Sequence, residues 1–236
     1  EIHLPLNKYS EWVRFAFHPA PGIKVRGICQ FLLKSFEPPF DLYCTPLHID
    51  PHKPVMPISH PASYATYLAA KHGTFATLGL AEDTWSLSEK VLTEDEFLEQ
   101  TYEIHAEREA MFFDTLRCVR QGAIACVFDT SDRVQHMFFR FFDEKHPALQ
   151  PQERASHAAA FRQMYKVMDD LVGRTLEAIG DETALLVMSD HGFKPFRRGV
   201  DLNAWLVANG YMVLKDGAKT ASHPYLVDVD WSKTRA

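Results

Sequence analysis

The hydrophobic pattern after residue 93 alternates between helical periodicity and short, continuous apolar runs. Three runs have strand length and no polar face: "AIACVF" (123–128), "ALLVM" (184–188) and "YMVL" (211–214). Runs of this kind are typical of strands that are covered on both faces. Their alternation with helical segments over residues 123–214 predicts an α/β fold in which helices sandwich an open sheet.

Four segments carry helix signals. Thr93 stands three residues before Glu96, a capping-box pattern that begins a long helix. The stretch "DTSDRVQHMFFRFF" (129–142) resembles a loop that opens into a helix. Apolar residues recur every three or four positions over 156–180, and a shorter helix is expected over 201–209.

The first 60 residues have a different pattern. They hold many of the 14 prolines, with short β-leaning runs such as "WVRFAF", "VRGICQFLL" and "FDLYCTPLHI" between them. We therefore expect an irregular, strand-rich N-terminal lobe over residues 1–92, followed by an α/β core over residues 93–236.

Composition and charge narrow the functional classes. The formal net charge of −6 gives no general attraction to a polyphosphate backbone, so we expect no nucleic-acid polymer as partner. No apolar run reaches the roughly 18 residues that span a bilayer, and the opening residues lack a signal-peptide pattern, so we expect a soluble chain. The four cysteines form no CxxC pair, which favours a reducing compartment such as the cytoplasm.

Two pairs of acid and histidine follow two of the predicted strands. Asp132 and His136 are four apart, so on a helix they lie on one face. Asp190 and His191 are adjacent, and Gly192 gives the backbone the freedom for an irregular turn. Ligands of α/β sheets bind at the carboxyl ends of the strands, and carboxylate oxygen with imidazole nitrogen suits zinc or a similar metal.

Simpler readings of these pairs stay open at this point. The spacing of Asp132 and His136 also suits a solvated ion pair on a helix surface, and Asp190 also suits the cap of a turn that ends a strand. Lys194, Arg197 and Arg198 follow the second pair, where they belong either to a solvated loop or to a contact with a substrate phosphate.

The two motifs together carry a family resemblance. "FDTSDRVQHMFFRFF" and "LLVMSDHGFKPFRRGVDLNAWLVANGY" resemble the alkaline phosphatase superfamily, most closely its type I phosphodiesterase and nucleotide pyrophosphatase branch. The resemblance implies two divalent metal ions, zinc or else manganese. It places Asp132 and His136 on one ion and Asp190 and His191 on the other, with Lys194 and Arg198 as candidate substrate contacts.

The implied activity is hydrolysis of a small-molecule phosphoester by a Ser or Thr nucleophile. The family also has an aspartate ligand and the nucleophile upstream of these motifs, and a third histidine downstream. None of the three has a convincing match in this sequence. Thr130, Ser131 and His223 are assigned to none of these roles. We therefore expect an internal piece of a longer enzyme that is inactive or nearly so by itself.

Other functions remain possible on the sequence alone. A phosphatase, sulfatase or phosphomutase of the same superfamily would share these motifs, and a non-catalytic binding domain could keep the fold without turnover. The sequence indicates no oligomeric state.

Overall fold

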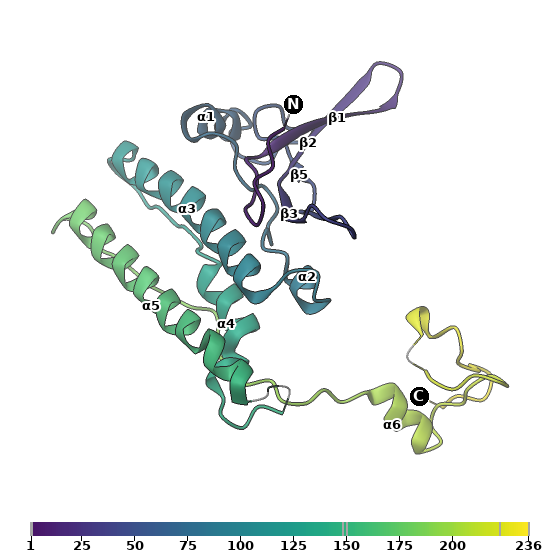
Figure 1. Ribbon diagram of the computed structural model, residues 1–236. Helices are drawn as coiled ribbons and strands as arrows, with labels where there is room; N and C mark the ends of the chain where they lie inside the picture. Colours follow the sequence, from purple (N-terminus) through teal and green to yellow (C-terminus); the bar gives the residue numbers. More distant parts are fainter. Residues whose placement is uncertain (1, 148, 150, 222, 236) are drawn as a thin grey trace. The chain divides into compact units, whose positions relative to one another are not determined.

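The computed structural model describes residues 2–147, 149, 151–221 and 223–235, apart from the side chains of 151–156 and 224. The chain divides into two compact units, Glu1–Lys194 and Pro195–Ala236. Figure 1 shows the elements, which are β1 (Val13–Ala20), β2 (Ile23–Cys29), β3 (Phe31–Ser35), β4 (Asp41–Cys44), β5 (His48–Ile49), α1 (Ser63–His72), α2 (Thr84–Ser88), α3 (Glu94–Cys118), α4 (Thr130–Phe142), α5 (Pro151–Ile179), α6 (Leu202–Ala208) and the 3₁₀ turn η1 (Pro224–Leu226).

The N-terminal lobe is built from two small antiparallel sheets. One has the strand order β1-β2-β5 and the other pairs β3 with β4. The β1–β2 hairpin turns at Gly22, whose φ of 78° lies in the left-handed region that glycine adopts without a steric penalty. The strands overlap the β-leaning runs of the first 60 residues, and β1 continues through Pro19. The rest of the predicted lobe holds the helices α1 and α2.

Helix α3 begins with the predicted capping box. The Thr93 hydroxyl accepts from the Glu96 amide at 3.3 Å, and the Glu96 carboxylate accepts from the Thr93 amide at 2.7 Å. The middle of this helix contacts the lobe, where Glu107 accepts from the Trp12 indole at 2.6 Å and from the Ala76 amide at 2.8 Å. The predicted boundary between residues 92 and 93 stays a prediction.

Helices α3, α4 and α5 lie side by side and enclose the largest apolar cluster (Figure 1). Phe138 of α4 is fully buried and stacks on Phe97 of α3, with ring centroids 6.2 Å apart. Met164 of α5 completes this core from the third side. The amphipathic helix expected over 156–180 is confirmed and begins earlier, at Pro151. Among the described residues, no helix has both the length and the apolar character needed to cross a membrane.

The three apolar runs after residue 122 do not form the predicted strands. In the described residues, 123–128 and 184–188 have no ladder partner, and within 211–214 only Leu214 makes an isolated bridge, to Val229. Leu186 and Met188 are 81% and 86% exposed, far from the burial expected of a central strand. A strand that is covered on both faces also needs neighbouring strands that pair with its two edges. The local sequence pattern does not show whether such neighbours are present. The fold is mixed α/β, but the described residues show no helix-sandwiched sheet.

The second unit contains α6 and a small apolar cluster. The Asp201 side chain caps α6 by accepting from the Ala204 amide at 3.0 Å, and the chain leaves the helix at Gly210, where φ is 70°. Met212 and Val229 are buried in the cluster. The helix therefore forms where the sequence predicts it.

The Phe97–Phe138 stack predicts a large loss of stability when Phe138 is truncated. Phe138→Ala should lower the free energy of unfolding by about 3–5 kcal/mol, because it removes a fully buried ring and leaves a cavity. Phe142→Ala, in the same helix but 60% exposed, is the matched control and should cost much less. Equal losses for the two variants in urea titrations would contradict the described core.

Stability should fall with acid because His48 is buried in its neutral form. The His48 ring accepts at Nδ1 from the Thr77 amide at 2.9 Å, and burial lowers its pKa to about 4. Between that value and its ordinary pKa the unfolded chain binds a proton that the folded chain does not, so acidification favours unfolding.

The free energy of unfolding should fall less between pH 7 and pH 4 in His48→Asn than in the wild type, by about 2–3 kcal/mol. His18→Asn, at an exposed position on β1, serves as the control. The measurement is urea unfolding at a series of pH values, and an unchanged pH slope in His48→Asn would refute the assignment.

Candidate metal centre

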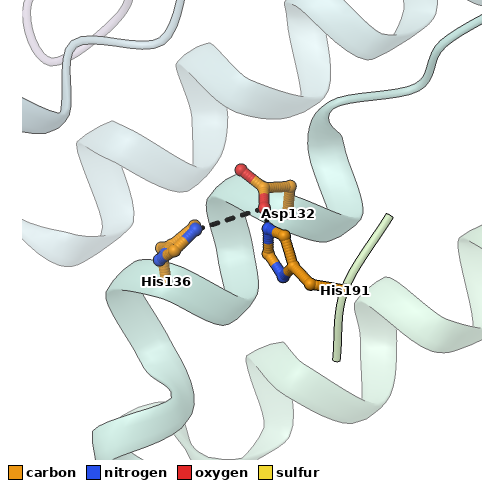
Figure 2. A group of neighbouring side chains, drawn as sticks. All are labelled: Asp132, His136 and His191. Atoms are coloured by element: carbon orange, nitrogen blue, oxygen red, sulfur yellow. Dashed lines mark ion pairs between the residues drawn. The ribbon is translucent and has the colours of Figure 1, made fainter. Parts of the chain in front are cut away.

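Helix α4 carries the first acid and histidine pair near its N-terminal end. Asp132 lies in the first turn, where a carboxylate interacts favourably with the helix dipole. Four residues later, His136 Nε2 lies 3.2 Å from Asp132 Oδ1 (Figure 2). The prediction that the two side chains share one face of a helix is confirmed.

His191 reaches the same place from a distant part of the chain. Its Nε2 lies 3.5 Å from Asp132 Oδ1, and the imidazoles of His136 and His191 have centroids 5.8 Å apart. Figure 2 shows His191 on a separate backbone segment beside the helix, with its ring directed at the Asp132 carboxylate. The ligand atoms of the three side chains all lie within 4.8 Å of one another.

Local hydrogen bonds orient His191. Its backbone amide donates to Asp190 Oδ1 at 3.1 Å, and Ser189 Oγ donates to its carbonyl at 2.6 Å. The ring nitrogen Nδ1 lies 3.1 Å from the Gly192 carbonyl oxygen. A proton on Nδ1 satisfies this contact and leaves the Nε2 lone pair facing Asp132, which is the tautomer that a metal ligand requires.

Phe193 supports both imidazoles. Its ring meets His136 and His191 edge-on, with centroid distances of 4.8 Å and 5.1 Å, and it stacks on Phe139 of α4 at 6.3 Å. Phe193 lies only two residues after His191, but no sequence motif marks it as part of the site. Phe193 therefore packs against both imidazoles and against Phe139 of α4.

Asp190 has a different environment from the three gathered side chains. Its side chain is 88% exposed, and its Oδ2 is 3.9 Å from His191 Nε2. The expected division of the four ligands between two metals stays a prediction, since the structure groups His191 with the first pair. Lys194 is exposed and Arg198 belongs to the second unit, and their contact with substrate also stays a prediction.

The donor set suits a divalent metal. Two imidazole nitrogens and one carboxylate oxygen are the three protein ligands of many catalytic zinc sites, which leave a further position open. The side chains of His136 and His191 are 50% and 47% exposed, so the group is accessible from solvent. The residues present therefore fit a divalent metal ion with a coordination position left open to solvent.

Comparison with known proteins identifies a family for most of the chain. The family model described as type I phosphodiesterase / nucleotide pyrophosphatase matches residues 53–232, a range that contains Asp132, His136, Asp190 and His191. No curated protein and no solved structure matches the chain. The match extends over more than half of the sequence and confirms the resemblance that the two motifs indicated. The chain belongs to the type I phosphodiesterase / nucleotide pyrophosphatase family.

Proposed function

We propose that this chain provides the metal-binding part of a metal-dependent phosphoesterase of the phosphodiesterase and nucleotide pyrophosphatase type. Membership of the family implies hydrolysis of phosphodiester or pyrophosphate bonds. The observation that carries the proposal is the convergence of Asp132, His136 and His191, which are brought together from two segments nearly sixty residues apart. The substrate is a small-molecule phosphoester.

Asp132 Oδ1, His136 Nε2 and His191 Nε2 are the proposed ligands of one zinc or manganese ion. Asp190 is the proposed additional ligand of a second ion, for which its exposed carboxylate is available. A bound divalent metal supplies positive charge that polarises a phosphoryl oxygen and stabilises the charge that develops during transfer.

The protein's own side chains prepare the site for this ion. The Gly192 carbonyl holds a proton on His191 Nδ1, and Phe193 keeps both imidazoles from rotating. Lys194 and Arg198 are the proposed contacts for phosphate oxygens, since both are exposed cations that follow His191 in the sequence. Their role is to bind and orient the substrate.

The attacking Ser or Thr is assigned to no residue of this chain. Thr130 stands two residues before Asp132, but its side chain is buried and its hydroxyl lies 2.9 Å from His105 Nδ1. A hydroxyl in that position is directed into the packed interface between α3 and α4, so Thr130 serves the fold. We therefore propose a nucleophile outside the 236 residues, and expect little turnover from this chain alone.

The chain should bind zinc through the three gathered side chains. We expect at least stoichiometric zinc in the wild-type chain by calorimetric titration, and affinity at least about tenfold lower in His136→Ala and His191→Ala. His157→Ala is the matched control. His157 forms a similar pair with Asp95, in which Nε2 lies 3.2 Å from Oδ1, and neither residue belongs to the proposed centre. Asp190→Ala should reduce the number of ions bound without abolishing binding.

A zinc affinity that none of these substitutions changes would contradict the proposed centre. A loss in His157→Ala equal to the loss in His191→Ala would also contradict it, because a general effect of removing a histidine would then explain the data.

Substrate class is tested with p-nitrophenyl esters and the protein that carries this chain. A phosphodiester should be hydrolysed faster than the matching phosphomonoester or sulfate ester, and chelation of the metal should stop the reaction. Asp132→Asn should reduce hydrolysis on the order of 100-fold. Preferential hydrolysis of the monoester or sulfate would assign another chemistry of the superfamily, and no hydrolysis of any ester would favour a binding domain.

A further inference from the structure

A buried carboxylate without a hydrogen bond lies in the segment before α2. The Glu82 side chain has no exposed surface, and in the described structure neither of its carboxylate oxygens has a hydrogen-bond partner. The backbone beside it is fixed, because Asp83 accepts from the Tyr43 hydroxyl at 2.7 Å and its amide donates to Gln100 at 2.7 Å. Burial of a carboxylate without a hydrogen bond is costly, so its position needs a physical reason.

Arg133 connects this carboxylate with the metal centre. Its Nε lies 3.8 Å from Glu82 Oε2, and its Nη1 lies 3.5 Å from Asp132 Oδ2. The arginine side chain is only 17% exposed, so the interaction is partly shielded from solvent. Glu82, Arg133 and Asp132 therefore form a row of alternating charges that ends at a proposed metal ligand.

The two oxygens of Asp132 face different partners. Oδ1 lies 3.2 Å from His136 Nε2 and 3.5 Å from His191 Nε2, whereas Oδ2 faces the Arg133 guanidinium. A carboxylate is free to rotate about its last bond unless a contact holds it. The guanidinium on Oδ2 provides that contact and leaves Oδ1 on the side of the imidazoles.

A second arginine near Glu82 already has its own partner. Arg108 is the other cation that acts on Glu82, and it pairs with Asp129 at 2.7 Å. Burial raises the pKa of the Glu82 carboxyl, while the guanidinium groups of Arg108 and Arg133 oppose this rise. Arg108 is therefore neutralised by Asp129, and Arg133 is the cation that forms an ion pair with Glu82.

We propose that Glu82 and Arg133 are positioning residues of the metal centre: Glu82 holds the Arg133 guanidinium, and Arg133 orients Asp132 so that Oδ1 is presented to the ion. The inference rests on the proposed metal-binding function and adds two residues to it. Groups that orient metal ligands in this way commonly change metal affinity by about 10–100-fold when they are removed.

The test is a double-mutant cycle on zinc affinity of the 236-residue chain, measured by calorimetry. Glu82→Gln keeps the shape of the side chain and removes its charge, and should weaken zinc binding on the order of tenfold. Arg133→Gln should weaken it similarly. If Glu82 acts through Arg133, adding Glu82→Gln to Arg133→Gln should change the affinity by less than about twofold.

Glu94→Gln is the matched control. Glu94 forms a carboxylate–arginine pair with Arg140 of the same helix α4, at 2.9 Å, but this pair has no contact with Asp132 in the described structure. The zinc affinity of the Glu94→Gln variant should equal that of the wild type. Circular dichroism and thermal unfolding of every variant show that the fold is retained, and Arg133→Lys, which keeps the charge, should restore part of the lost affinity.

Three results would overturn the inference. Zinc affinity unchanged in Glu82→Gln would remove the role of Glu82, and an equal loss from Glu82→Gln in both backgrounds would show that it does not act through Arg133. If Glu82→Gln does not fold, wild-type affinity in Arg133→Gln still overturns the inference. In each case a wild-type chain that binds zinc leaves the proposed function intact, whereas a wild-type chain that binds none overturns both.

Discussion

The apolar packing of α4 between α3 and α5 is the interaction on which the site depends. Val134, Phe138 and Phe141 lie on the buried face of α4, and Asp132 and His136 lie on the opposite face because of the helical repeat. Burial of the aromatic face thus determines which way the ligands point. Phe139 adds the contact with Phe193, which places the segment of His191 beside the same helix.

The parts of the fold that follow from local rules could be predicted from the sequence. The capping box at Thr93 and the periodicity of α5 depend on residues three or four positions apart, so they are visible in the chain itself. The strands predicted at 123–128, 184–188 and 211–214 were wrong for the described residues because a doubly covered strand is defined by distant neighbours. An apolar run shows what a segment can bury, and tertiary contacts decide where it does so.

In the candidate site, too, the features that follow from local sequence could be predicted, and those that depend on tertiary contacts could not. The shared face of Asp132 and His136 follows from helix geometry, and the irregular backbone at Asp190 and His191 was expected from their adjacent positions. Their convergence was a hypothesis that gained weight from the family resemblance. Nothing in the sequence around Glu82 indicates its place near the site, since it stands fifty residues before Asp132 and is connected to it through the side chain of Arg133.

The central claim is that Asp132, His136 and His191 bind one metal ion, and X-ray absorption spectroscopy of the chain with one equivalent of zinc tests it most directly. The account predicts nitrogen and oxygen ligands at about 2.0–2.2 Å with two imidazoles, and one imidazole fewer in His191→Ala. A spectrum dominated by sulfur at about 2.3 Å, or an imidazole count that His191→Ala leaves unchanged, would contradict it.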